Sequence, residues 1–389
     1  MRFVWHPAAV AVDAQGVRHL QGAAAMHPVL MPPRPAAAAL QSVIGAPAFR
    51  IGGTGPLAVG EGVFQTLTGG SSGTPARITR SQQSWIESFR VNARLFDLGP
   101  DTRVGVPGAL IHSLALYAAI EALHLGAEAH LLDGLRPDRQ ARAMADRAID
   151  VLYTTPAQLK GLVEAGIDWP RLRHVIVGGA KLAQADRSAL SARTDAKVTE
   201  FYGAAETSFI TMSDAETPAG SVGRPYPGVE IACREGVIWV RSPYLALDAA
   251  RDGAARPGAA LWQDGWVAPG ECGRIEDGYL WLTGRIGRRV KVADQTVQLE
   301  VIEEVLAVQP GVQAGAVIAV PDLRRGHVLT ACVVGDASQE PAILAALRAS
   351  FGPLMAPRRL HWRASLPLLP SGKTDLAQLM QDHGGRTNG

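Results

Sequence analysis

Short apolar segments alternate with helical patterns between residues 80 and 202, and this alternation limits the fold more than any other feature of the chain. The apolar segments have the length of buried strands, and the stretches between them carry apolar residues at helical spacing. We expect helices over 80–96, 110–125, 139–148 and 157–165, and strands over 103–107, 129–132, 151–154, 172–177 and 198–202. The alternation predicts a layered α/β domain with a largely parallel sheet, whose ligands bind beyond the carboxyl ends of the strands.

The helix over 80–96 shows most clearly which of its faces is buried. Trp85, Phe89 and Phe96 lie on one side at helical spacing. Thr79 and Ser81 are both suitable caps for its first turn, because a hydroxyl oxygen can accept a hydrogen bond from an unpaired backbone N–H. The helix therefore begins directly after one of these two residues.

The pattern changes after about residue 220. Apolar strands over 229–233, 237–241 and 279–282 are separated by the turn signals Glu235-Gly236 and Asp277-Gly278, which predicts a β-rich subdomain. Beyond a basic run at 285–291 we expect a small α+β domain with helices over 299–306 and 341–351 and strands over 315–320 and 329–334. The chain therefore divides into a large domain at 1–285 and a small domain at 286–389, which the resemblance described below implies is a mobile lid. Residues 1–50 show poor periodicity and receive no assignment.

Composition excludes several classes of protein. Lys and Arg number 38 against 36 Asp and Glu, so the net charge of +2 gives no general argument for binding nucleic acid or an anionic membrane. The three cysteines, Cys233, Cys272 and Cys332, are far apart, which argues against a disulfide framework or a zinc knuckle. The longest apolar stretch, 109–120, is too short to span a bilayer. We expect a soluble cytoplasmic protein without a leader peptide.

A loop rich in glycine and hydroxyl groups lies between two apolar segments at 66–78. Glycines let backbone N–H groups turn inward, and hydroxyls add further donors, so such a loop can hold a polyphosphate. It lacks the Gly-Lys-Ser/Thr ending of the kinase-type phosphate loop. On this segment alone, a surface turn and a phosphate-binding loop are equally good interpretations.

Four motifs in order make the chain resemble the adenylate-forming superfamily, which includes acyl-CoA synthetases, adenylation domains and luciferases. They are Thr68-Gly-Gly-Ser-Ser-Gly-Thr-Pro75, Tyr202-Gly-Ala-Ala-Glu206, Asp277-Gly-Tyr-Leu-Trp-Leu-Thr-Gly-Arg285 and Leu369-Pro-Ser-Gly-Lys-Thr-Asp375. The resemblance covers roughly residues 64–380. It implies that a carboxylate attacks the α-phosphate of ATP, releases pyrophosphate and forms an acyl-adenylate.

The resemblance also implies which residues bind the nucleotide and its metal. The phosphates would lie against the loop residues Thr68, Gly70, Ser71, Ser72, Gly73, Thr74 and Arg77. Glu206 resembles the magnesium ligand, and one carboxylate with phosphate oxygens suits a mostly hydrated Mg²⁺. Tyr202 and the segment Gly178, Gly179 and Ala180 resemble the parts that pack against adenine, and Gly203, Ala205 and Thr207 are further candidates for binding the nucleotide. For these residues the alternatives are a solvated loop acid at Glu206 and ordinary packing at the strand ends.

Two further positions resemble the ribose site. Glu271 stands where the family usually has an aspartate that accepts both ribose hydroxyls, and Arg285 resembles the arginine near the ribose and phosphate. Lys373 resembles the lysine that enters the site and stabilises the charge that develops between carboxylate and α-phosphate. Its alternative is a surface lysine. His112 resembles a residue beside the acyl and thiol tunnel, with a hydrogen-bonded core histidine as the equal alternative.

The chain departs from the family at several positions. Ala76 stands at the loop lysine with Arg77 one residue later, Ala205 replaces a threonine, and Gly287 occupies the hinge position. Asp294 replaces a glycine of the loop that lines the pantetheine tunnel in the family. A negative side chain there argues against CoA as the acyl acceptor more than it argues against the adenylation step. The phosphate loop also begins unusually early, which leaves open a homodimer that completes the acyl pocket.

The resemblance therefore implies a ligase that uses ATP and Mg²⁺ to activate a fatty or aryl acid. The acyl group would pass to the thiol of CoA or to the phosphopantetheine of an acyl carrier protein. The departures support a second hypothesis, a degenerate nucleotide-binding partner or regulator without full turnover. A third is a subunit that depends on a partner protein.

Overall fold

The structure is a computed structural model that describes residues 1–32, 34–52, 57, 60–67, 77–247, 260–322, 325–368 and 374–384. A nine-stranded sheet forms its centre, in the order β13-β12-β11-β10-β9-β7-β8-β1-β2. Neighbouring strands from β11 to β1 run parallel, and the pairs at both edges are antiparallel. The bounds are β1 Val10–Val12, β2 Arg18–His19, β7 Arg103–Val106, β8 Glu128–Leu131, β9 Val151–Thr154, β10 His174–Gly178, β11 Lys197–Ala204, β12 Ser208–Ser213 and β13 Arg224–Pro225. The predicted layered α/β fold with a largely parallel sheet is confirmed.

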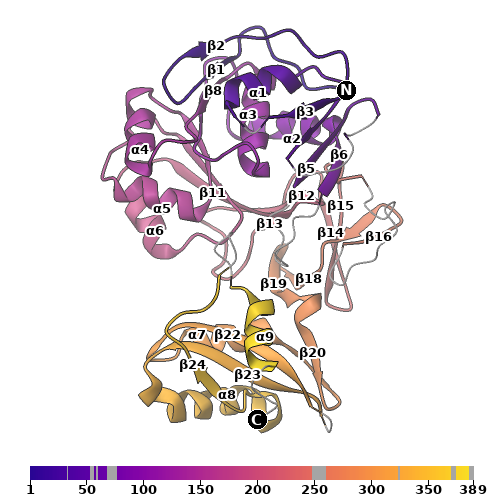
Figure 1. Ribbon diagram of the computed structural model, residues 1–389, viewed down its shortest axis with the longest axis vertical. Helices are drawn as coiled ribbons and strands as arrows, with labels where there is room; N and C mark the ends of the chain where they lie inside the picture. The colour runs from indigo at the N-terminus through magenta and orange to yellow at the C-terminus, as the bar shows by residue number, and fades with distance from the viewer. Residues whose placement is uncertain are drawn as a thin grey trace.

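Helices cover both faces of this sheet (Figure 1). On one face α2 (Gln82–Leu95) and α3 (Ser113–Leu125) pack with the side chains of Tyr153 and Ile176. On the other face α4 (Pro137–Asp146), α5 (Pro156–Glu164) and α6 (Gln184–Ser191) pack with Leu152, Val175 and Val177. Adjacent residues of β9 and β10 thus enter opposite cores, as the two-residue period of a strand requires. Because both faces are covered, the central strands read as continuous apolar runs.

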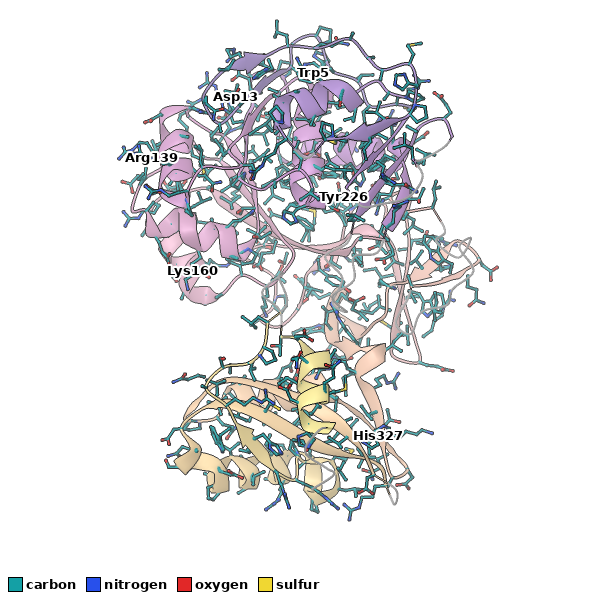
Figure 2. The ribbon with its side chains drawn as sticks, in the orientation of Figure 1. Trp5, Asp13, Arg139, Lys160, Tyr226 and His327 are labelled. Carbon is teal, nitrogen blue, oxygen red and sulfur yellow. The ribbon has the colours of Figure 1, made fainter. Side chains whose placement is uncertain are left out.

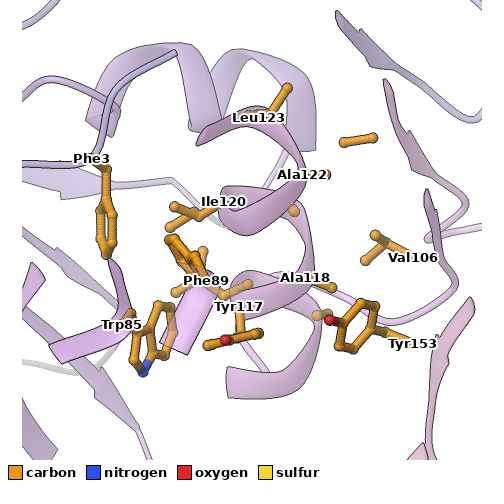
Figure 3. Close-up of a cluster of buried hydrophobic side chains, with 14 of the residues drawn as sticks. Phe3, Trp85, Phe89, Val106, Tyr117, Ala118, Ile120, Ala122, Leu123 and Tyr153 are labelled. Atoms are coloured by element: carbon orange, nitrogen blue, oxygen red, sulfur yellow. The ribbon is translucent and has the colours of Figure 1, made fainter. Parts of the chain in front are cut away.

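Helix α3 is buried on all sides, which explains why its sequence is apolar almost throughout. Every residue from Ala115 to Leu123 is buried. Figure 3 shows α3 between the rings of Phe3, Trp85 and Phe89 on one side and Val106 and Tyr153 on the other. A helix this short gains little from its own hydrogen bonds in water, so its stability comes from this packing.

One carboxyl group is buried in this core. Glu121 of α3 is 1% exposed and accepts hydrogen bonds from Asn92 Nδ2, at 2.9 Å, and from the hydroxyl of Tyr153. Asn92 also accepts a bond of 2.7 Å from the hydroxyl of Tyr226, and its Nδ2 lies 3.1 Å from the hydroxyl of Tyr117. Figure 2 locates Tyr226 in the larger domain. Burial raises the pKa of Glu121 to about 7, against the bonds it accepts, which favour the ionised form.

Smaller sheets flank the centre. A four-stranded sheet precedes α2, and a six-stranded sheet forms the predicted β-rich subdomain. The first contains β3 Val29–Met31, β4 Ala48–Ile51, β5 Val63–Leu67 and β6 Arg77–Ser81, with α1 Ala36–Val43 beside it. The second contains β14 Glu230–Arg234, β15 Val237–Arg241, β16 Leu261–Gln263, β17 Trp266–Ala268, β18 Glu271–Glu276 and β19 Tyr279–Arg285. Glu235-Gly236 and Asp277-Gly278 form its hairpin turns with positive φ at both positions, as predicted.

The small C-terminal domain has its own core, around α7 and the central strands of a three-stranded sheet. It lies below the larger domain in Figure 1. Its elements are β20 Arg289–Val292, β21 Gln295–Gln298, α7 Leu299–Ala307, β22 Val312–Asp322, β23 Gly326–Gly335, α8 Glu340–Met355, β24 Leu360–Trp362 and α9 Leu376–Gly384, with short 3₁₀ turns at Ile286–Arg288 and Ala337–Gln339. Gly352 interrupts α8 with non-helical angles, so regular helix ends where the sequence predicts. The boundary at 285/286 stays a prediction. No described helix is long and apolar enough to cross a membrane.

Several expectations differ from the structure. The helix predicted over 80–96 begins at Gln82, because Arg80 and Ser81 belong to strand β6. The helix predicted over 110–125 begins at Ser113, because 107–112 form a turn in which the His112 N–H bonds the Ala109 carbonyl. Residues 1–50, which received no assignment, contribute β1 to the edge of the parallel run, where it pairs with β8. That strand forms only by long-range pairing, which local periodicity does not report. The predicted cap Ser81 is confirmed, since its side chain accepts from Ser84 N at 3.1 Å.

Replacing Glu121 by glutamine should remove one component of the pH dependence of stability. The folded chain keeps the Glu121 proton up to about pH 7, whereas the unfolded chain loses it near pH 4.5. Stability from this group is therefore full below pH 4.5, falls as pH rises to 7 and is constant above. We expect the advantage of wild type over Glu121→Gln to shrink by about 3 kcal/mol across that interval. Chemical denaturation at several pH values measures it.

The exposed Glu164 of α5 offers the matched control, and Glu164→Gln should leave the pH dependence as in wild type. Parallel curves for wild type and Glu121→Gln at every pH would contradict the assignment of a protonated Glu121.

Candidate functional site

Two of the predicted segments meet at the carboxyl edge of the parallel sheet. Strand β10 ends at Gly178, which lies directly opposite Phe201 of β11. Strand β11 then turns back through 205–207 into β12, and this turn carries Glu206. The predicted segments 178–180 and 202–207 are therefore neighbours, where α/β sheets bind their ligands.

Two glycines at this edge have no room for a side chain. A Cβ on Gly178 would lie 2.2 Å from the ring of Phe201, and one on Gly203 would lie 1.9 Å from the carbonyl oxygen of Ser208. The first contact could relax by a ring shift, but the second is with backbone. The crossing of Gly203 and Ser208 thus fixes the turn that presents Glu206.

The turn residues around Glu206 have distinct partners. Thr207 is fully buried, and its hydroxyl accepts a bond of 3.1 Å from the N–H of Ala204. The carbonyl oxygen of Ala205 accepts a bond of 2.6 Å from Arg80. Thr207 and Ala205 therefore serve the turn itself, and their predicted contact with the nucleotide stays a prediction. Burial raises the pKa of the Glu206 carboxyl, and the charge of Arg80 opposes that shift.

The β-rich subdomain brings a second carboxylate to this edge. Glu271 of β18 is paired across the sheet with Arg285 of β19, and Glu271 Oε1 lies 3.7 Å from Arg285 Nη2. Burial raises the pKa of Glu271, the neighbouring Arg285 lowers it, and the charge of Glu206 raises it further. The two acids are therefore close enough to influence each other.

The phenol of Tyr202 lies beside the Glu271 carboxylate. Within the described part of the chain, neither Tyr202 Oη nor Glu271 Oε2 has a hydrogen bond of normal geometry, although both atoms are buried. Buried polar atoms normally have partners. An oxygen without one, next to a half-exposed guanidinium, can accept hydroxyl groups of a ligand.

His112 is exposed at the N-terminus of α3, and its side chain does not cap the helix. The alternative of a hydrogen-bonded core histidine is therefore wrong. Ala180 and Gly179 are also exposed, at the end of β10. A role for these residues toward a ligand stays a prediction.

The remaining predicted residues lie outside the described part of the chain. They are Thr68, Gly70, Ser71, Ser72, Gly73 and Thr74 of the loop, and Lys373. The flanks are described: Leu67 pairs with Arg77 across the β5–β6 hairpin, and Leu368 forms an isolated bridge with Thr374. Both segments are thus closed at their bases by antiparallel contacts.

Sequence reasoning missed Arg80. In β6, Ile78 and Arg80 are buried while Arg77 lies on the other face of the strand. The basic group whose charge acts on Glu206 is Arg80. The role of Arg77 toward the phosphates stays a prediction. A charged residue at an inward position of a strand was the available signal.

The residues present fit a magnesium ion bound mainly through a nucleotide. Among the described residues no group of three or more His, Cys, Asp or Glu could hold a metal. Glu206 offers a half-buried carboxylate at the strand edge. Mg²⁺ keeps several waters and usually takes one or two carboxylates with substrate phosphates, which suits this single ligand.

Comparison with known families agrees with this geometry. The model of the AMP-binding enzyme family matches residues 59–247, and that of the AMP-binding enzyme C-terminal domain matches 301–373. The chain belongs to the adenylate-forming superfamily. The resemblance inferred from the four motifs is thereby confirmed.

Curated relatives of this adenylate-forming chain include acid ligases. It is 29% identical over 338 residues to the uncharacterized acyl-CoA ligase YhfT of Bacillus subtilis, covering 80% of this chain and 66% of that protein. It is 28% identical over 347 residues to the fatty acid–acyl-carrier-protein ligase ScoC of Streptomyces coeruleorubidus, covering 80% and 65%. The chain thus spans about two thirds of the length of these relatives.

Solved structures show the same fold. The amide bond synthetase McbA from Marinactinospora thermotolerans superposes with a TM-score of 0.69 at 27% identity, over 90% of this chain and 78% of that one. ATP-bound MatB from Rhodopseudomonas palustris superposes with a TM-score of 0.74 at 18% identity, over 97% and 96%. The second likeness concerns the fold alone. A large N-terminal domain and a small C-terminal domain are common to these enzymes.

Substituting Gly203 by alanine should disrupt the site. The added Cβ would collide with the backbone of Ser208, so we expect a loss of about 3 kcal/mol of stability and a loss of ATP binding. Thermal unfolding and nucleotide titration measure both effects. Gly99→Ala is the control, because a Cβ there meets nothing within 4 Å. Equal stability of the two variants would contradict the close crossing.

Proposed function

We propose that this chain activates a carboxylic acid with ATP, forming an acyl-adenylate and pyrophosphate, and then transfers the acyl group to a thiol. One observation carries the proposal. Two partly buried carboxylates from separate sheets, Glu206 and Glu271, lie close enough to interact at the carboxyl edge of the parallel sheet. This is the place and the chemistry that a magnesium nucleotide requires.

Each side chain has a defined task in this proposal. Glu271 accepts the ribose hydroxyls, and the neighbouring Arg285 favours the ionised form of that carboxylate against the effect of burial, which raises its pKa. Glu206 holds the magnesium ion, which neutralises phosphate charge when bound.

Lys373 supplies the positive charge of the proposed reaction. It lies between Leu368 and Thr374, which form an isolated antiparallel bridge. A lysine ammonium aimed at the carboxylate and α-phosphate stabilises the charge that builds up between them. Backbone and hydroxyl donors of the 68–74 segment would hold the leaving phosphates.

The relatives support a thiol acceptor. One is named an acyl-CoA ligase and another a fatty acid–acyl-carrier-protein ligase, whereas the structural neighbour McbA is an amide bond synthetase. We assign a fatty or aryl acid as substrate and CoA or carrier-protein phosphopantetheine as acceptor. Asp294 lies exposed in the β20–β21 turn, where its charge would meet an incoming pantetheine arm only after the small domain closes.

Replacing Lys373 by alanine should abolish most of the acid-dependent activity. We expect pyrophosphate release on a panel of fatty and aryl acids to fall by about 10²–10³-fold, because one charge-stabilising donor is lost. Lys160→Ala is the control, since Lys160 lies exposed on the outer helix α5 (Figure 2). If none of the acids gives pyrophosphate release that depends on Lys373, the ligase assignment is contradicted and a nucleotide-binding regulator is favoured.

Offering CoA, a holo-carrier protein and an amine to the same reaction identifies the acceptor. Product formed with the amine alone would overturn the thiol assignment. The mass of the active species in solution tests the homodimer.

Replacing Glu271 by glutamine should weaken the preference for ribose. A lost hydrogen bond to a charged group costs about 1.5–3 kcal/mol, so ATP should bind about tenfold or more weakly, while 2′-deoxy-ATP should lose less. The affinity ratio of the two nucleotides, measured by titration, should move toward one. Glu276→Gln, on the exposed end of the same strand, is the control. An unchanged ratio in Glu271→Gln would remove Glu271 from the ribose site.

A further inference from the structure

Arg80 carries a charge into the interior of the large domain. Its side chain is 2% exposed, and burial lowers its pKa to about 10, so it remains a cation at neutral pH. It extends from β6 beside Phe64, the residue opposite it in β5. An ionised group in such a place is costly unless it is well hydrogen-bonded.

The partners of this guanidinium are backbone carbonyls from two distant segments. Nη1 donates to the carbonyl oxygen of Tyr244 at 2.8 Å, and Nη2 donates to that of Ala205 at 2.6 Å. A weaker contact of 3.4 Å joins Nη1 to Ser84 Oγ. Within the described part of the chain, the carboxylate whose charge acts on Arg80 is that of Glu206.

Further backbone bonds tie the same three segments together. The N–H of Ala246 donates to the carbonyl oxygen of Glu206 at 2.7 Å, and the N–H of Leu247 donates to that of Thr79 at 2.8 Å. Arg80 is therefore the side chain at the centre of a junction between β6, the turn at 205–207 and the segment at 244–247. Strand β6 directly follows the predicted phosphate loop.

Two carbonyl oxygens from different segments, each bound by its own Nη group, are better bridged by a guanidinium than by an ammonium. The two Nη groups of arginine lie in a rigid plane and can bridge two acceptors, whereas lysine presents one point charge on a flexible stem. A residue that only neutralised Glu206 would need no such fork. The geometry indicates that orientation matters as well as charge.

We propose that Arg80 is a positioning residue that sets the Glu206 carboxylate at the place the magnesium nucleotide requires. The inference rests on the proposed function and extends it to a residue that touches neither ATP nor acid. Through Ala205 it fixes the main chain one residue before Glu206, and through β6 it relates that carboxylate to the base of the phosphate loop. Mg²⁺ requires near-ideal octahedral geometry. A displaced Glu206 carboxylate should therefore weaken ATP binding in the presence of Mg²⁺ more than ATP binding without the metal.

The test compares ATP affinity with Mg²⁺ and with EDTA in wild type, Arg80→Lys and Arg80→Met. Positioning partners of metal ligands are worth about 10–100-fold in affinity. We expect both variants to bind ATP in EDTA as tightly as wild type does. The increase in ATP affinity that Mg²⁺ produces should fall by about tenfold or more, and it should fall less in Arg80→Lys than in Arg80→Met. Mn²⁺, which takes the same oxygen ligands, should restore part of the loss because it tolerates looser geometry.

Arg147 provides the matched control. It also donates from two Nη groups to two carbonyl oxygens, those of Asp13 and Ala14, both at 2.9 Å, and it lies at the far edge of the sheet. Arg147→Lys and Arg147→Met should leave the Mg²⁺ dependence as in wild type. Thermal unfolding of all variants separates loss of fold from loss of positioning, and Arg80→Met, which removes the buried charge, should still fold.

The outcomes separate the inference from the function on which it rests. If wild type binds ATP more tightly with Mg²⁺ and the Arg80 variants show the same tightening, Arg80 is not a positioning residue although the function stands. If wild type shows no tightening, both are wrong. If both Arg80 variants lose their folded transition while the Arg147 variants keep it, Arg80 acts in folding, and the inference is overturned.

Discussion

The burial of helix α3 with its single carboxyl group is the constraint on which the rest of the large domain depends. Glu121 accepts from Asn92 of α2 and Tyr153 of β9, so one side chain relates two helices and the sheet. Asn92 extends the network to Tyr226, which follows β13 at the far edge of the sheet. Leaving any of these groups unpaired costs about 1–3 kcal/mol, comparable with the burial of one large apolar side chain.

The candidate site lies at the edge of the sheet that this core supports, and its residues are held by contacts outside the core. Backbone crossings too close for a side chain fix the turn after β11, and a buried arginine ties that turn to β6. The β-rich subdomain then adds Glu271 and Arg285 from a separate sheet. The chemistry of the site therefore depends on three units of structure that are far apart in the chain, with charges that act on one another across short distances.

Sequence patterns predicted the central strands and helices because each has a period that burial on both faces imposes. The strand at Val151–Thr154 and the Ser81 cap agree with the structure. The start of α3 was placed three residues early, since apolar composition does not distinguish a buried turn from a buried helix. The short strand at Val10–Val12 escaped notice, because three residues carry no measurable period and its pairing with β8 is a tertiary contact.

The candidate site residues divide in the same way, into those that the sequence indicated and those that only the folded structure revealed. Tyr202, Glu206 and Arg285 could be selected because they stand in motifs that resemble those of the adenylate-forming family, and Glu271 because it stands where the family usually has an aspartate. Arg80 could not be selected, because only the alternation of β6 within the folded sheet shows that its side chain enters the core. The sequence by itself thus determined the family, through its ordered motifs, and the layered α/β class, through the local period of its apolar residues. The tertiary structure alone decided which charges lie together. A carboxylate and a guanidinium affect each other according to their distance and burial, and the order of residues along the chain gives neither quantity.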